Sequence, residues 1–392
     1  MTGYLIENGR VITMTEAGTI ENGQVWIEEG KIKQVGQDLT VPEGIERIDA
    51  KGGYVMPGLI DAHCHAGIFE TGIGFPGDDG NETSNPITPE IRAVDGVNFL
   101  DPEFARAVQG GITTIATGPG SANPIAGQFI AMKTAGSSFK SQIIKETLAM
   151  KFAFGENPKN VYGKKSQAPV TRMATAGLIR EWLTKAQEYA KKEKAGELET
   201  VDLKLAPLAK VMTGQMPVKA HCHRVDDILT ALRIAEEFNL VMSLEHGSEG
   251  YLIPQAIKEA DVPVILGPFL GFPHKPEAVK VHPKSARVLS EAGVKIAIMT
   301  DLPAMHLESL PLVVGACMKE GLSEEEAFKS VTLNAAEILG IADRVGSLAP
   351  GMDADVVIFD GHPFANALSR CVLTMIDGEI THKGSESHVG SV

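Results

Sequence analysis

The 392-residue sequence contains only four cysteines, and no two of them are spaced as a C-x-x-C pair. Thiols this sparse are too few for the disulfide framework of a secreted domain. The cysteines are Cys64, Cys222, Cys317 and Cys371. We therefore expect reduced thiols and a cytoplasmic protein.

Long apolar runs and clusters of positive charge are also missing. No uninterrupted stretch approaches the ~20 apolar residues that a membrane-spanning helix requires. The N-terminus lacks the basic and apolar segments of a signal peptide. The net charge is −14 at pH 7, whereas nucleic acids and anionic membranes are bound through clustered Lys and Arg. The sequence thus predicts neither a nucleic acid nor a membrane as a partner.

Both ends of the chain carry short strand-like stretches separated by turn signals such as Asn8-Gly9 and Glu29-Gly30. Alternation with a period of two residues is typical of β-strands. The stretches are residues 4–6, 10–12, 24–27, 31–35, 353–359 and 372–380. We expect residues 1–56 and 341–392 to form one small β-sandwich domain from the two ends.

The middle of the chain alternates apolar strand patterns with amphipathic helical patterns. Repeated βα units imply a parallel sheet, and eight of them imply a closed barrel. The sequence therefore predicts an α/β fold with a (β/α)8 TIM-type barrel over residues 57–340. Its active site should lie at the carboxyl ends of the strands. The expected strands are residues 57–65, 112–116, 129–132, 148–154, 218–221, 240–244, 262–266 and 294–299.

The first expected barrel strand ends in two histidines, His63 and His65. Residues i and i+2 of a strand point to the same face, so the two imidazoles should project together. Zinc-type ions bind histidine nitrogen at about 2.0–2.1 Å. The pair therefore indicates part of a metal site.

Other expected strands end in residues of the same kind. A lone histidine is usually structural, because one hydrogen bond can hold it. Here the histidines fall at the same end of separate strands, and this shared position favours a metal site. The strand over residues 148–154 contains Lys151 and runs into Glu156. The remaining candidates at strand ends are His221, His223, His246 and Asp301.

The run Pro-Gly-Leu-Ile-Asp-Ala-His-Cys-His at residues 57–65, the histidines at two later strand ends and the aspartate after the last strand resemble the metal-dependent amidohydrolase superfamily. Residues 332–340 and 346–357 are similar to the segments that lead back into that family's β-sandwich. The resemblance covers nearly the whole chain. It points to the branch of imidazolonepropionases and dipeptidases.

The resemblance implies a set of metal ligands. A carboxylate from the fourth strand would bridge two ions, and Glu156 is the first choice because the metal-binding groups of a barrel lie at its carboxyl-terminal rim. Carbamylated Lys151 is the alternative. The residues that match the family's other ligands are His63, His65, His221, His246 and Asp301.

The resemblance also implies the chemistry. The cofactor would be two divalent ions, with zinc expected and manganese or iron as alternatives. Asp301 would be the catalytic group that accepts a proton and passes it to the leaving nitrogen. The expected reaction is hydrolysis of an amide, cyclic amide or dipeptide-like C–N bond in a small-molecule substrate.

Three further residues are candidates for contact with the substrate. His223 has the same facing as His221, His274 lies on the loop after the seventh strand, and Arg92 lies in the long loop over residues 67–98. The alternative for Arg92 is an ion pair with the nearby Glu90. We also expect a homo-oligomer, the commonest assembly of soluble proteins.

Two other functions remain as alternatives. A deaminase of a cyclic amidine with a single metal ion would need a glutamate after His221, where the sequence has His223-Arg224-Val225. An inactive scaffold of the same fold would typically lose metal ligands, whereas this chain keeps a candidate at every position.

Overall fold

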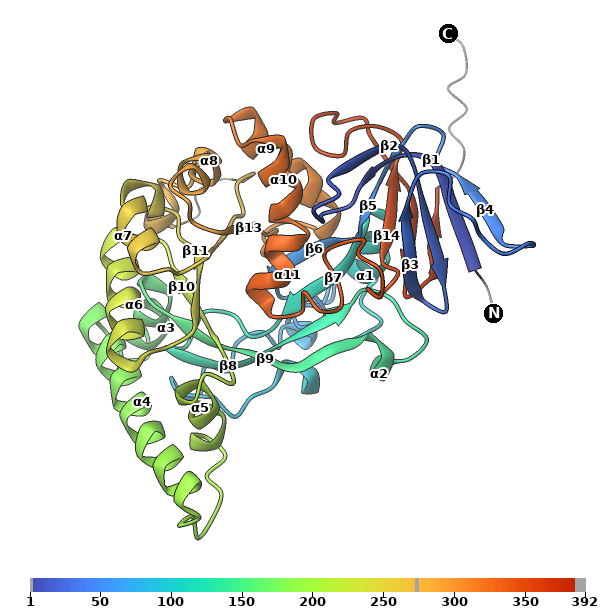
Figure 1. Cartoon of the computed structure of the whole chain (residues 1–392). Coiled ribbons are helices and arrows are strands. Elements are labelled where there is room, and N and C mark those ends of the chain that lie inside the picture. The colour runs from blue at the N-terminus through green and yellow to red at the C-terminus, as the bar shows by residue number, and fades with distance from the viewer. Residues whose placement is uncertain (1–2, 272–274, 385–392) are drawn as a thin grey trace.

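The computed structural model describes residues 3–271 and 275–384. Within these residues the strands form two eight-stranded sheets. One sheet is built from both ends of the chain and the other from the middle, so blue and red strands lie together in Figure 1.

In the terminal sheet, the N-terminal and C-terminal parts of the chain meet where β5 (Tyr54–Pro57) pairs with β14 (Val356–Phe359). β5 pairs parallel with β1 (Gly3–Ile12) and antiparallel with β14. All of these strands belong to one sheet, so the second layer of a sandwich and the domain limits at 56 and 341 stay predictions. The other strands are β2 (Thr19–Glu28), β3 (Lys31–Gly36), β4 (Glu46–Asp49), β15 (Cys371–Ile376) and β16 (Glu379–Lys383).

The second sheet is a nearly closed barrel of the TIM type. Its strands follow the sequence order around the sheet, and each one overlaps an expected strand. Their apolar residues are almost completely buried, as expected for strands covered on both faces. The strands are β6 (Leu59–Cys64), β7 (Ile112–Thr117), β8 (Ile125–Lys133), β9 (Ile143–Ala153), β10 (Val218–Cys222), β11 (Met242–His246), β12 (Val264–Leu266) and β13 (Ile296–Ile298).

The prediction of a continuous βα repeat is wrong at β8, because this strand pairs antiparallel with both β7 and β9. The segment before β8 contains no helix, and the segment after it contains only the four-residue α2 (Phe139–Gln142). A parallel crossover needs about a dozen or more residues, usually with a helix. These connections are too short for one, so β8 folds back along its neighbours.

The first and last barrel strands meet through a few hydrogen bonds outside the regular pairing. The backbone amide of Asp301 donates to the carbonyl of His63 (3.3 Å). The amide and hydroxyl of Thr300 donate to the carboxylate of Asp61 (3.1 and 2.6 Å). These bonds bring the end of β6 beside the segment that follows β13.

Helices cover the outside of the barrel. The longest, α4 (Arg172–Ala195), starts at the Thr171 side chain, which caps the amide of Ala174, and ends at Gly196 with φ 71°. It projects from the barrel next to α5 (Leu205–Met212) (Figure 1). The other α-helices are α1 (Pro102–Gln109), α3 (Glu156–Gly163), α6 (Val225–Phe238), α7 (Pro254–Glu259), α8 (Lys284–Glu291), α9 (Leu310–Lys319), α10 (Glu324–Ser330) and α11 (Leu333–Leu339).

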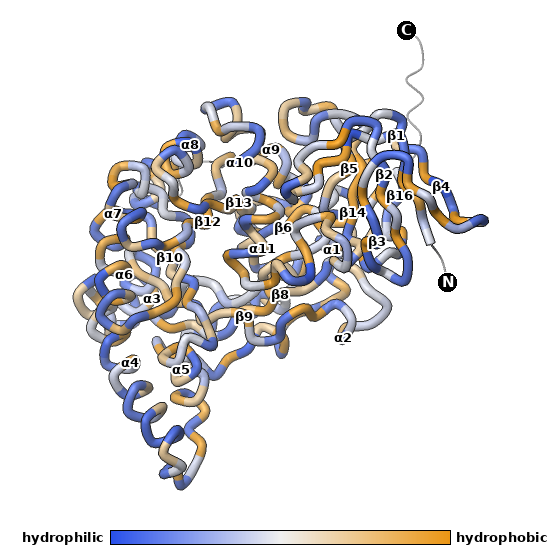
Figure 2. The backbone as a smooth tube through the Cα atoms, in the orientation of Figure 1, coloured by the Kyte–Doolittle hydropathy of each residue, from blue (hydrophilic) through white to orange (hydrophobic). Residues whose placement is uncertain are grey.

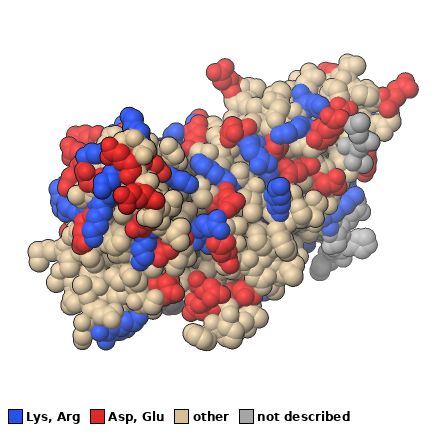
Figure 3. Space-filling model, turned by 90° about the horizontal axis from the view of Figure 1, so that it is seen from below, with Lys and Arg blue, Asp and Glu red and all other residues tan. Residues whose placement is uncertain are grey.

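Polarity follows this arrangement. Apolar residues line the inner strands β5 and β14, whereas α4 carries many hydrophilic residues (Figure 2). On the face seen in Figure 3, basic and acidic side chains are interspersed. Among the helices of the described residues, none has the length and hydropathy needed to cross a bilayer.

Lys133, the last residue of β8, joins the barrel to the terminal sheet. Its buried ammonium lies 2.8 Å from Asp353 Oδ2, 2.8 Å from Asp355 Oδ1 and 2.6 Å from Asp377 Oδ1. Burial lowers the pKa of Lys133, but the surrounding carboxylates outweigh this and raise it. The lysine therefore stays charged and balances acids from the C-terminal part of the chain.

Replacing Lys133 by Met should lower the free energy of unfolding by about 3–5 kcal/mol, because buried carboxylates lose their cation. Lys31→Met is the matched control. The Lys31 side chain is 46% exposed and contacts Asp353 from outside, so its loss should cost about 1 kcal/mol or less. Urea unfolding followed by circular dichroism measures both values. Equal losses in the two variants would contradict a stabilising role for the Lys133 junction.

Candidate functional site

A cavity of about 770 Å³ opens at the carboxyl ends of the barrel strands. Phe69 and Phe269 supply apolar walls, and Asn157 and Lys275 supply polar groups. Six of the residues singled out in the sequence line this cavity together: His65, Glu156, His221, His223, His246 and Asp301.

His63, His65 and Asp301 form the first of two groups that can hold a metal ion. The Nε2 atoms of His63 and His65 lie 3.7 and 3.6 Å from Asp301 Oδ1. The two imidazole centroids are 5.2 Å apart. The structure therefore brings His63 of β6 and His65, the residue after this strand, to the aspartate that follows β13.

His221, His223 and His246 form the second group. One ligand nitrogen from each ring lies within 4.8 Å of the others. Glu277 approaches this group, because its Oε1 lies 3.8 Å from the Nε2 atoms of both His221 and His223. The sequence analysis had placed His223 with the substrate and had not singled out Glu277.

Backbone carbonyls orient one histidine of each group. His65 Nδ1 lies 2.6 Å from the carbonyl oxygen of Gly118, and His246 Nδ1 lies 2.8 Å from that of Gly267. A carbonyl only accepts, so each Nδ1 is the N–H donor and each Nε2 keeps a free lone pair. This tautomer is the one that a metal ligand needs.

Side chains lie close to the Nδ1 atoms of two more histidines, as a charged contact for His63 and as a hydrogen bond for His223. His63 Nδ1 lies 2.7 Å from Glu245 Oε2, and His223 Nδ1 lies 2.7 Å from Ser248 Oγ. A carboxylate or hydroxyl behind a histidine fixes the ring and raises the basicity of its other nitrogen. His223 Nε2 has no hydrogen-bond partner among the described residues.

Burial also keeps these imidazoles neutral. It lowers the pKa of His65 to about 3, and it lowers the pKa of the other four histidines well below the usual value. Neutral imidazole is the form that binds metal ions. His246 and Asp301 also have positive φ angles of 69° and 55°, and such strained backbone clusters at functional sites.

Lys151 lies inside the barrel next to the first group. Its Nζ is 3.1 Å from His63 Nε2, and its side chain is completely buried. Burial lowers the pKa of Lys151, whereas burial raises that of Asp301. Glu156 lines the cavity but belongs to neither group, because its Oε2 accepts the backbone amide of Glu277 (3.3 Å).

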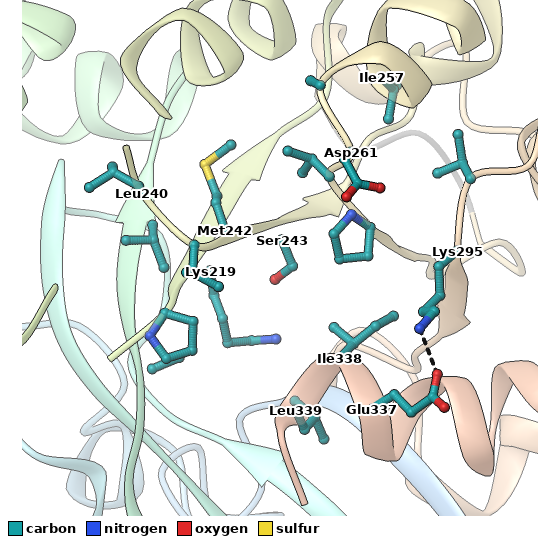
Figure 4. Close-up of a pocket in the computed structure, with 18 of the residues that line it drawn as sticks. Lys219, Leu240, Met242, Ser243, Ile257, Asp261, Lys295, Glu337, Ile338 and Leu339 are labelled. Carbon is teal, nitrogen blue, oxygen red and sulfur yellow. Dashed lines mark hydrogen bonds and ion pairs between the residues drawn. The ribbon is translucent and has the colours of Figure 1, made fainter. Parts of the chain in front are cut away.

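A buried set of charged and polar side chains lies on the side of His63 that faces away from the cavity. Glu245 Oε2 also lies 2.9 Å from Lys219 Nζ, and Ser243 Oγ donates to Glu245 Oε1 (2.5 Å). Lys219 and Ser243 reach a second cavity of about 480 Å³ at the amino ends of the strands (Figure 4). At its rim Lys295 pairs with Glu337. Glu245 thus stands between this cavity and the histidines.

The two remaining substrate candidates lie elsewhere. Arg92 forms ion pairs with Asp95 (2.9 Å) and Glu146 (3.1 Å) and does not line the cavity. His274 lies outside the described residues.

Sequence reasoning missed Lys219, Glu245, Lys275 and Glu277. Two of them carried a signal, because Lys219 and Glu245 are charged residues inside otherwise apolar strand patterns, and buried charges need partners. Lys275 and Glu277 lie in the loop after β12 and have no periodic pattern. Only the folded chain shows that this loop returns to the histidines.

A barrel that presents neutral imidazoles and an aspartate to one cavity is typical of enzymes that bind divalent ions. The model of the Amidohydrolase family matches residues 54–381. The crystal structure of an amidohydrolase from Thermotoga maritima MSB8 matches with a TM-score of 0.93 and 40% identity, covering 97% of this chain and 100% of that one.

Curated relatives agree with this family. Amidohydrolase tasK of Hapsidospora irregularis is 30% identical over 387 residues; the match covers 91% of this chain but only 39% of that protein. The chain thus spans about two fifths of that relative's length. The imidazolonepropionase of Geobacillus kaustophilus (strain HTA426) is 28% identical over 394 residues, covering 88% of this chain and 86% of that protein.

The chain therefore belongs to the Amidohydrolase family. Amidohydrolases are hydrolases of C–N bonds, and the family generally uses divalent metal ions.

Replacing Glu245 by Gln should weaken binding of a divalent ion at the first group about 10- to 100-fold, because a neutral amide orients His63 less firmly and places no negative charge behind its ring. Competition with a chromogenic chelator measures the dissociation constant. Ser243→Ala is the matched control, since it removes a hydrogen bond to Glu245 Oε1 and leaves the Oε2 contact with His63. Its effect should be smaller, and an equal effect would contradict the role of Oε2.

Proposed function

We propose that the chain is a metal-dependent hydrolase of an amide or cyclic amide C–N bond in a small molecule, with two divalent ions at the barrel mouth. One observation carries the proposal: two groups of metal-binding residues face the same cavity. The residues that would hold the ions are His63, His65 and Asp301 in the first group and His221 and His246 in the second.

The donor set fits divalent ions. The imidazoles are neutral, hydrogen bonds hold the Nδ1 atoms of three of them, and the Glu245 carboxylate lies 2.7 Å from the Nδ1 of His63. Histidine nitrogen with aspartate oxygen suits zinc, whereas a set made mainly of carboxylates would suit magnesium or calcium. Zinc is therefore the expected ion, and manganese and iron remain alternatives.

Lys151 is the better candidate for the bridge between the ions, since it lies beside His63 whereas Glu156 turns to the Glu277 amide. A neutral lysine amine adds to the carbon of carbon dioxide and loses one proton, which leaves a carbamate with two oxygens. The lowered pKa of Lys151, caused mainly by its burial, favours this neutral amine.

The reaction needs a nucleophile and a proton carrier. Divalent ions held by the two groups would supply the first by lowering the pKa of water to about 7, and they would polarise the substrate carbonyl. Asp301 supplies the second. Its carboxylate accepts the proton of the attacking water as the oxygen bonds to the carbonyl carbon, and it protonates the leaving nitrogen as the C–N bond breaks.

The cavity favours a small substrate with both apolar and polar parts. Phe69 and Phe269 can pack against an apolar group, while Asn157 and Lys275 can bind oxygen atoms. The presence of two separate ligand groups supports a pair of ions over the single ion of the deaminase alternative.

Replacing Asp301 by Asn should reduce kcat about 10²- to 10⁴-fold, because the amide cannot carry the proton. The assay follows amine release from a panel of N-acyl amino acids and dipeptides, and the loss of ultraviolet absorbance as cyclic imides open. Asp343→Asn, a change of the same chemistry at an exposed residue, is the control and should keep full activity. An active Asp301→Asn enzyme would refute the proton-transfer role.

Replacing Lys151 by Gln should lower the zinc content from two equivalents toward one, whereas Glu156→Gln should keep two. Plasma mass spectrometry of the purified proteins gives both numbers. Carbon-13 NMR after incubation with labelled bicarbonate would detect a carbamate in the unmodified protein and none in Lys151→Gln. The reverse result for metal content would restore Glu156 as the bridge.

A further inference from the structure

We propose that His221, His223, His246 and Glu277 form a complete four-ligand site that holds one divalent ion without help from Lys151. This inference rests on the proposed function, because it assumes that the cavity holds metal. It goes beyond that proposal by adding two ligands, His223 and Glu277, and by giving the two ions different roles.

The first argument is the direction of the Glu277 carboxylate. Its side chain is completely buried, and Oε2 is tied down by the backbone amide of Glu156 (2.9 Å). Oε1 is left to face the imidazoles, 3.8 Å from His221 Nε2 and from His223 Nε2. Ligand atoms about 2.0–2.2 Å from a tetrahedral zinc ion lie roughly 3.4 Å from one another. The two Glu277 contacts are therefore only a few tenths of an ångström longer than in such a site, and the ligand nitrogen of His246 lies within 4.8 Å of those of His221 and His223.

The second argument is the unpaired nitrogen of His223. This side chain is 5% exposed, and its Nε2 has no hydrogen-bond partner among the described residues. A buried polar atom without a partner is costly, and a metal ion is one explanation for it. Ser248 holds the other ring nitrogen, so the free Nε2 points to the group for a structural reason.

The third argument is that a glycine next to Glu277 leaves room for its carboxylate. Gly155 has φ 87°, and a Cβ atom at this position would lie 2.7 Å from Glu277 Oε2. The glycine thus permits the close approach of the chain after β9 to Glu277. Arg172 adds a cation 3.9 Å from the same oxygen and helps to keep the acid ionised.

The present cationic partner of Glu277 Oε1 is Lys275, whose Nζ lies 2.8 Å away. Lys275 lines the cavity and its side chain is 13% exposed, so it can turn toward solvent. A divalent ion would then replace one positive charge by two next to Glu277. Lys275 would become free to bind an anionic group of the substrate.

The two groups differ in the number of ligands. Metal sites with four protein ligands are usually structural, and the His221, His223, His246 and Glu277 site would have four. The His63, His65 and Asp301 group offers only three side chains besides the Lys151 carbamate, and Asp301 is the proposed proton carrier. The ion of this group would therefore carry the reaction, and the ion of the His221, His223, His246 and Glu277 site would keep the cavity wall in place.

The test isolates the second site by removing the first one. The double variant His63→Asn and His65→Asn should retain about one equivalent of zinc after dialysis against a weak chelator. Adding Glu277→Gln or His223→Asn to it should reduce the zinc content to near zero. Adding Glu337→Gln, the same change at a carboxylate that pairs with Lys295 at the other cavity, is the matched control and should leave the one equivalent unchanged.

A measurement on the unmodified protein guards against misfolded variants. Anomalous diffraction at the zinc edge should give a peak within about 2.0–2.2 Å of three imidazole nitrogens and Glu277 Oε1. A single peak at His63, His65 and Asp301 would overturn this inference and leave the proposed function standing. A second peak without Glu277 or His223 as ligand would also overturn it. A protein that binds no zinc, manganese or iron would overturn both proposals.

Discussion

Asp61 accepts two hydrogen bonds from Thr300, and this contact spans almost the whole length of the barrel segment. It closes the seam between β6 and the residues after β13. The adjacent bond from the Asp301 amide to the His63 carbonyl extends the same seam to the rim. The His63, His65 and Asp301 group depends on this closure, since two of its residues lie at the end of the first strand and the third follows the last one.

The interior of the barrel is unusually rich in charge. Lys151, Lys219 and Glu245 are buried in it beside the histidines, and Phe129 packs under both lysines at 5.5 Å. Buried charges are costly unless they are paired. Here the pairs serve orientation, because Glu245 binds His63 on one side and Lys219 on the other. Pairing thus offsets the free-energy cost of burying these charges, and it places one imidazole in the tautomer that binds a metal.

The sequence predicts the strands of the barrel and the convergence of histidines, because apolar period and strand ends are local features. It does not predict the reversal of β8, which depends on the length of two connections and on long-range pairing. It also leaves Glu156 and Lys151 as alternatives, since the direction of a side chain at the rim depends on its neighbours. The sequence does not predict Glu277 as a site residue at all, because its loop has no periodic pattern. Its place beside the histidines follows only from contacts with residues about 55 positions earlier in the chain.

The reversed strand β8 has a further consequence for how this chain can be divided. Because it runs against its neighbours, its last residue, Lys133, leaves the barrel at the amino ends of the other strands and enters the acids of the terminal sheet. The two parts therefore share one buried ionic centre. A shortened chain that kept only residues 57–340 would expose that lysine and an apolar surface together, so the barrel is not a portable module and should aggregate when produced alone.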